Sequence, residues 1–131
     1  MSIKKYLVLK ANERGYKVKI DKPYFTPWEG YVKSGYVSYV HRQIELYIAG
    51  YRARLFVLAH EVGHTFGDTE YPRYCIKQLS VEWEAWNWAE KALQGNISER
   101  DMALYRKFRN GCINEYFDTI PQFQTEETNV Y

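Results

Sequence analysis

The sequence predicts an α+β fold in which a small antiparallel sheet precedes three of the helices. Residues 16–20 and 44–48 alternate between apolar and polar side chains, which is typical of strands with one buried face. Residues 52–66 and 80–93 instead carry apolar side chains at helical spacing. With 131 residues and 46% hydrophobic content, the chain is expected to form one domain over residues 1–118.

The other elements of the first half are delimited by glycine and proline. They are a helix from Ile3 to about Arg14 that ends at Gly15, a loop over residues 21–30, and a β-hairpin of residues 31–33 and 36–40 joined by Ser34-Gly35. With the strands of residues 16–20 and 44–48, they are expected to form an aromatic-rich antiparallel sheet ahead of the central helix.

The most informative motif is His60-Glu61-Val62-Gly63-His64, within the predicted helix of residues 52–66. Residues four apart share one face of a helix, so His60 and His64 can present two imidazole nitrogens to one metal ion. Zinc favours such donors in a tetrahedral shell, and a catalytic site leaves one position to water. Glu61 would lie beside that water and take its proton as it attacks a carbonyl. Gly63 is small enough to let another segment approach, and the motif predicts a zinc-dependent hydrolase.

A third protein ligand is expected on the helix of residues 80–93, for which Ser80 fits an N-cap and Gly95 a stop. Its apolar sector consists of Val81, Ala85, Trp88, Ala89 and Ala92. Glu82 falls inside this sector, whereas Glu84 and Glu90 point away from its centre. A carboxylate in an apolar face is costly to bury unless it meets a cation or a metal. Glu82 is therefore the predicted ligand and Glu84 the alternative; a salt bridge to an arginine or a partly exposed carboxylate at the helix start would also explain Glu82.

The two motifs together resemble those of the ImmA/IrrE-type zincin-like metallopeptidases. There, a His-Glu-x-x-His motif precedes a helix with the pattern Glu-x-x-Ala-x-x-Phe-Ala, which Glu82, Ala85, Trp88 and Ala89 match. The chain departs from the family at Trp86, where Asn or Asp is common, and it lacks the Leu-Leu-Met-Pro stretch that often closes that helix. The likeness covers residues 55–93, and the variant is similar to small phage- and plasmid-encoded members.

The resemblance implies a zincin-like fold and a peptidase with Zn²⁺ held by His60, His64 and Glu82, acting on a peptide or a regulatory protein. In zincin-like folds an edge strand beside the active-site helix pairs with the substrate, and Gln43–Ile48 is the candidate strand unless both of its edges are covered. A hydrogen-bond donor to the tetrahedral oxyanion is also expected. The candidates for this donor are Tyr71, Tyr74, Tyr116 and His41, each of which also fits an ordinary structural role.

Two functions of other classes stay open. One is a catalytically silent binding or regulatory protein of a mobile element, which keeps the metal for stability. The other is an anti-restriction-type factor associated with nucleic acid. The net charge of +2, from 18 basic and 16 acidic residues, disfavours nucleic acid as a partner.

The remaining features predict a cytoplasmic protein with a flexible end. Cys75 and Cys112 lack the spacing of a disulfide framework or a metal motif, no apolar run reaches the length of a membrane span, and the N-terminus is too polar for a secretory signal. Ser98 is expected to cap a third helix that ends at about Phe117. The polar residues 119–131 are expected to form a disordered tail.

Overall fold

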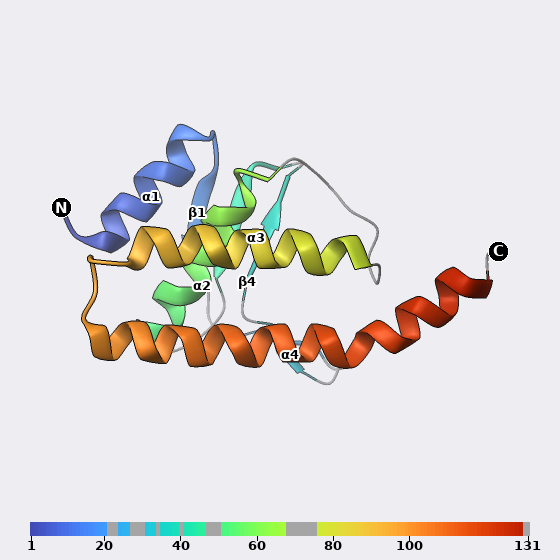
Figure 1. Cartoon of the computed structure of the whole chain (residues 1–131). Helices are drawn as coiled ribbons and strands as arrows, with labels where there is room; N and C mark the ends of the chain where they lie inside the picture. The colour runs from blue at the N-terminus through green and yellow to red at the C-terminus, as the bar shows by residue number, and fades with distance from the viewer. Residues whose placement is uncertain are drawn as a thin grey trace.

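The computed structural model describes residues 1–20, 24–26, 31–33, 35–39, 41–46, 51–67 and 76–129, and for residues 24–26, 31–33, 36, 51, 76–78 and 116–129 it describes the backbone alone. In the described part the chain is α+β, as predicted (Figure 1). Its elements are α1 (Ile3–Glu13), β1 (Lys17–Ile20), β2 (Tyr24–Thr26), β3 (Tyr31–Lys33), β4 (Gly35–Ser38), β5 (Gln43–Leu46), α2 (Tyr51–His64), α3 (Ile76–Leu93) and α4 (Glu99–Asn129).

The main sheet is mixed, so the predicted antiparallel sheet is wrong for one strand pair. The described strands lie in the order β1-β5-β4, with β1 parallel and β4 antiparallel to β5. Val18 and Val37 thus both lie opposite Ile44, on either side of it. Parallel pairing needs a connection of a dozen or more residues, and the long segment between β1 and β5 supplies it.

The predicted hairpin around Ser34-Gly35 is also wrong. β3 pairs with β2 in a separate two-stranded sheet, whereas β4 pairs with β5. β2 falls within residues 21–30, which were expected to form a loop. Tyr24, Phe25 and Thr26, which lie between the two prolines, are strong strand formers and account for the difference. Gly35 is a point of close approach, since a Cβ there would lie 2.9 Å from the Glu45 carbonyl oxygen and 3.0 Å from a Val57 methyl carbon.

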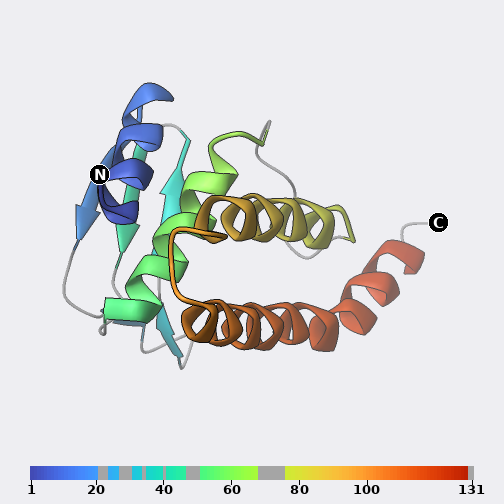
Figure 2. The same ribbon diagram turned by 60° about the vertical axis from the view of Figure 1, so that its left-hand side comes forward.

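Helix α2 is the centre of the structure. In Figure 2 it lies between the sheet with α1 on one side and the α3–α4 pair on the other. Residues 55–65 are all buried, so α2 has no solvent-facing stripe beyond its first turn, where Arg52 is exposed. One hydrophobic cluster surrounds it, which includes Leu7, Ile44, Leu46, Trp86, Leu93, Met102 and Tyr105.

Local sequence determines most of the helix ends. Gly15 and Gly95 adopt φ values of 85° and 79° after α1 and α3, a conformation that other residues rarely accept, and both were predicted as stops. Ser98 caps α4 as predicted, because its Oγ accepts a hydrogen bond of 3.1 Å from the backbone N–H of Asp101. Ser80, however, is not an N-cap. Helix α3 already begins at Ile76, since residues 76–79 are adequate helix formers that extend it.

Helix α4 does not end near Phe117, and residues 119–129 are helical instead of disordered. A helix that is already nucleated adds one hydrogen bond per residue, and the Gln and Glu residues of this segment have high helix propensity. The last turns bend away from the axis of α4 in Figure 1. Pro121 lies in this part of the helix, where it removes one backbone donor and favours a bend.

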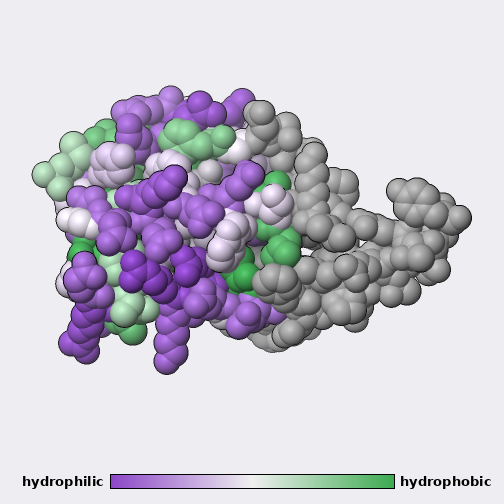
Figure 3. Space-filling model, viewed as in Figure 1, coloured by the Kyte–Doolittle hydropathy of each residue, from purple (hydrophilic) through white to green (hydrophobic). Residues whose placement is uncertain are grey.

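Hydrophilic residues predominate on the face seen in Figure 3, and hydrophobic ones occupy small separate areas. Exposed apolar side chains of α1 and α3, such as Leu9 and Trp83, lie among charged ones. Within the described residues, no helix combines the length and the apolar character needed to cross a bilayer.

The Ser98 cap gives a test of how α4 begins. Ser98→Ala removes the acceptor for the Asp101 amide and is expected to lower the free energy of unfolding by about 1 kcal/mol. Ser80→Ala is the matched control, because Ser80 is exposed in the interior of α3 and alanine is the better helix former, so its effect should stay within about 0.5 kcal/mol. Urea unfolding of both variants measures the difference. Equal effects would contradict the assignment of the cap.

Candidate metal centre

Helices α2 and α3 touch through their backbones at Gly63. A Cβ on Gly63 would lie 2.5 Å from the carbonyl oxygen of Ala85 and 3.1 Å from its Cα, so only glycine allows this approach. Glu82 lies three residues before Ala85, on the same side of α3. The contact therefore brings the Glu82 carboxylate to the turn of α2 that carries the two histidines, and it confirms the expectation for Gly63.

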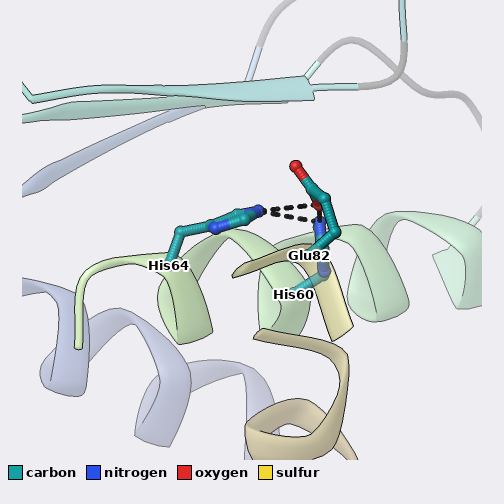
Figure 4. A group of neighbouring side chains, drawn as sticks. All are labelled: His60, His64 and Glu82. Atoms are coloured by element: carbon teal, nitrogen blue, oxygen red, sulfur yellow. Dashed lines mark hydrogen bonds and ion pairs between the residues drawn. The ribbon is translucent and has the colours of Figure 1, made fainter. Parts of the chain in front are cut away.

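The predicted ligands converge. His60 Nε2 lies 2.8 Å and His64 Nε2 3.0 Å from the same oxygen of Glu82, and the two nitrogens are 3.0 Å apart. Figure 4 shows the two rings and the carboxylate pointing toward one another. All three residues are buried, at 6%, 6% and 5% exposure. The group could hold a metal ion, as the sequence predicted.

The buried face of α3 differs slightly from the predicted apolar sector. Its buried residues are Glu82, Ala85, Trp86, Ala89 and Leu93, whereas Val81, Trp88 and Ala92 are only half-buried. Glu82 therefore lies on the central line of the face and not at its margin. Glu84 is exposed, and Glu90 forms ion pairs with Arg106 and Arg109. These positions favour Glu82 over Glu84 as the third ligand.

The carboxylate of Glu82 stays ionised despite its burial. Burial alone would raise its pKa, but hydrogen bonds from His60 and His64 and their charges hold the pKa well below its usual range. Burial lowers the pKa of His60 to about 4, against the opposing effect of Glu82. For His64, burial also acts downward, but the hydrogen bond to Glu82 and the charges of Glu82 and Glu61 outweigh it and raise the pKa.

While Glu82 is ionised, the two imidazoles cannot both satisfy their contacts with protons alone. If each Nε2 carries a proton for Glu82, the two N–H groups face each other at 3.0 Å. If one Nε2 is bare, its lone pair faces the carboxylate oxygen at short distance. A shared cation would resolve this conflict, because both lone pairs and the carboxylate would then point at positive charge.

Glu61 lies next to this group and is 7% exposed. Burial raises its pKa to about 7, with a further upward contribution from the charge of Glu82 and a downward one from His64. A carboxyl group with a pKa near neutrality can both accept and return a proton. The arrangement thus combines a cation site with a buried proton acceptor.

Tyr39, just after β4, is a nearby residue that the sequence analysis missed. Its hydroxyl donates to the backbone carbonyl of His64 at 3.5 Å, and burial together with the charges of Glu61 and Glu82 raises its pKa to about 12. No spacing rule could have identified it, because its position depends on how β4 packs against α2. It adds a neutral hydroxyl donor at the C-terminal end of α2.

Among the other candidates for a site role, only His41 and Cys112 have side chains in the described part of the structure. Tyr71, Tyr74 and Cys75 lie outside the described residues, and so does the side chain of Tyr116. His41 is exposed in the turn after β4, where its backbone N–H binds Ser38 Oγ. Cys112 is half-buried, and burial raises the pKa of its thiol to about 11.

The expected substrate strand is the central strand of the sheet. Residues 43–46 form β5, which has β1 on one side and β4 on the other, and residues 47 and 48 lie outside the described part. Both backbone edges of β5 are therefore paired, so it cannot add a peptide strand. Its fully buried Ile44 and Leu46 make it a core strand, as the alternative interpretation held.

The C-terminal end of α2 is held by side chains from elsewhere in the chain. The guanidinium of Arg14 donates two hydrogen bonds, of 3.2 and 3.0 Å, to the Thr65 carbonyl, and Thr65 Oγ1 donates to the Val62 carbonyl at 2.6 Å. Arg14 thus supplies donors for the Thr65 carbonyl, whereas the carbonyls of Val62 and His64, the latter also bound by Tyr39, accept backbone N–H groups of Thr65 and Gly67 as well. These contacts fix the turn on which His64 lies.

Comparisons of the chain with protein-family models, with curated proteins and with solved structures found no match.

Gly63→Ala tests the helix contact that forms the centre. The new methyl group would press on the Ala85 carbonyl, so α3 must move outward and carry Glu82 with it. We expect a loss of about 1–3 kcal/mol in the free energy of unfolding and weakened metal binding. Gly111→Ala is the control, because no described atom lies within 4 Å of a Cβ there, and it should stabilise α4 by about 0.5–1 kcal/mol. A Gly63→Ala variant as stable as the wild type would be evidence against the contact.

Glu82→Gln and Glu84→Gln separate the two candidate ligands. Glu82→Gln keeps the shape of the side chain but removes the charge that faces both histidines, so affinity for Zn²⁺ should fall by at least about 100-fold, the upper end of the loss seen when a supporting group is removed. Glu84→Gln should bind as tightly as the wild type because Glu84 is exposed. Competition with a chelating dye gives the dissociation constants, and the reverse ranking would make Glu84 the ligand.

Proposed function

We propose that the protein is a zinc-dependent peptidase with a zincin-like fold, in which His60, His64 and Glu82 hold Zn²⁺ and Glu61 is the general base. The observation that carries this proposal is the convergence of one carboxylate oxygen on both imidazoles, with Glu61 buried beside them. The resemblance of the two motifs to ImmA/IrrE-type metallopeptidases supports the same assignment.

The donor set fits zinc. Two imidazole nitrogens and one carboxylate oxygen are ligands of catalytic zinc sites, which leave a fourth position open. The donor atoms lie 2.8 to 3.0 Å apart, a little closer than the ~3.3 Å expected between neighbouring ligands of a tetrahedral zinc ion. Small outward movements of the side chains would admit the ion. When bound there, zinc would polarise the peptide carbonyl and make water acidic enough to lose a proton near neutral pH.

Glu61 would accept that proton and later deliver it to the leaving amine. Its buried position, which holds the pKa at about 7, keeps the carboxylate basic enough for the first step and the acid strong enough for the second. Glu61 is itself only 7% exposed, so little bulk water would reach the exchange. Glu61 therefore has a role distinct from that of the three ligands.

The substrate in this proposal is an extended peptide. Since β5 is paired on both edges, the strand available to a peptide beside α2 is β4, whose one described neighbour is β5. β4 packs close to α2 at Gly35 and Val57, so a peptide added to it would run near the metal centre. Main-chain hydrogen bonds would provide affinity and the side chains of the peptide would provide selectivity.

Glu61→Gln separates metal binding from catalysis. The variant should keep a full equivalent of zinc, measured by metal analysis, and lose about 10²–10⁴-fold in the rate of peptide cleavage because no base replaces the carboxylate. The substrate probe is a mixed-sequence peptide library analysed by mass spectrometry. Glu84→Gln serves as control, and 1,10-phenanthroline should abolish cleavage until Zn²⁺ is restored. Equal rates in Glu61→Gln and the wild type, or no cleavage by the zinc-loaded wild type, would contradict the peptidase.

A further inference from the structure

The imidazole of His60 stacks on the indole of Trp86. The ring centroids are 3.9 Å apart and the planes differ by 24°, which is the closest of the aromatic contacts described. Trp86 is 3% exposed and lies four residues after Glu82, one turn further along α3. The same face of α3 thus presents a carboxylate to Nε2 of His60 and a flat surface to the ring itself.

Among the described residues, none is the partner that normally orients a metal-binding histidine through its second ring nitrogen. Such a histidine usually donates its second N–H to a carboxylate, a carbonyl or a water, and that hydrogen bond fixes the ring plane. Nδ1 of His60 is buried, and no described residue forms a hydrogen bond with it. The last torsion of a histidine side chain has broad minima, so something else must fix the ring.

Trp86 is itself held firmly. Its backbone carbonyl accepts a hydrogen bond of 2.6 Å from the hydroxyl of Tyr105, which is fully buried. Its ring packs against Tyr105 at 5.9 Å and against Phe108 at 6.1 Å, both on α4. Any tilt of the indole would displace this packing, so the surface under His60 is rigid.

We propose that Trp86 is a positioning residue for the metal centre, which fixes the plane of the His60 ring by stacking, in place of the usual hydrogen bond to Nδ1. This inference rests on the proposed metal site. The ring of His64 lies at 77° to that of His60, with centroids 4.5 Å apart, so a rotation of His60 would change the angle between two ligands. Loss of the stack therefore affects both the affinity and the geometry of the bound ion.

The test compares three substitutions in one aromatic cluster. Trp86→Leu removes the flat surface, Trp86→Phe keeps one, and Phe108→Leu disturbs the same core without touching His60, since Phe108 contacts Trp86 and Phe56. Each variant is assayed for Zn²⁺ affinity by chelator competition, for the visible spectrum of its Co²⁺ form, and for thermal unfolding without metal. Thermal unfolding without metal measures how far each substitution destabilises the core, independently of metal binding.

We expect Trp86→Leu to bind Zn²⁺ about 10–100-fold more weakly, the range seen when a group that orients a ligand is lost, and to show altered cobalt bands. Trp86→Phe should stay within about tenfold of the wild type. Phe108→Leu should unfold at a lower temperature yet keep wild-type affinity and spectrum, because the ring and the hydroxyl of Tyr105 still hold Trp86 in place. If Trp86→Leu does not fold, Trp86→Met replaces it, because a flexible thioether fills the space without a flat surface.

Wild-type affinity and cobalt bands in Trp86→Leu, or equal losses in Trp86→Leu and Phe108→Leu, would overturn the inference. A wild-type protein that binds no zinc would overturn the metal centre and this role with it. A wild-type protein that binds zinc but cleaves no peptide would contradict the peptidase alone. In that case the order of the variants in metal affinity still decides the role of Trp86.

Discussion

The backbone contact between Gly63 and Ala85 is the constraint on which the centre depends. Because Gly63 has no Cβ, α3 can lie directly against the turn of α2 that carries His60 and His64. The three donor atoms then meet within hydrogen-bond distance of one another. A glycine in the middle of a helix costs about 0.5–1 kcal/mol relative to alanine, and here the close crossing offsets that cost.

Burial shifts the pKa values of the residues at the centre, and it also costs free energy of folding. The buried polar residues described are His60, Glu61, His64, Thr65 and Glu82, so they are concentrated at one end of α2 and the facing turn of α3. Desolvation moves the pKa of Glu61 up to about 7 and that of His60 down to about 4, in each case toward the neutral form. A bound cation would relieve part of this cost, so metal binding would stabilise the fold.

Local patterns in the sequence predicted which three residues converge. His60 and His64 are one helical turn apart, and Glu82 lies in the apolar face of its helix. Local patterns also predicted the Ser98 cap and the glycine stops, which depend on neighbouring residues alone. The pairing of β1 with β5, the close approach of Gly35 and the place of Tyr39 depend on contacts between distant segments, and periodicity carries no information about them. The course of α4 beyond Phe117 was missed because polar composition was taken as disorder, although Glu and Gln propagate a helix well.

Trp86, which departs from the second motif, can be explained by the contacts of its side chain. Asn or Asp at this position, as in the family that the motifs resemble, would offer hydrogen bonds, whereas an indole offers a large apolar face. With Phe56, Tyr105 and Phe108 it forms an aromatic wall that links α2, α3 and α4, and Trp86 is the member of this wall that stacks on His60. Such a wall lowers the local dielectric, which strengthens the attraction between a cation and Glu82 but leaves the buried Nδ1 of His60 without a described partner. The centre thus relies on packing where a polar side chain at this position would supply a hydrogen bond, so its precision depends on the indole that α3 presents to His60.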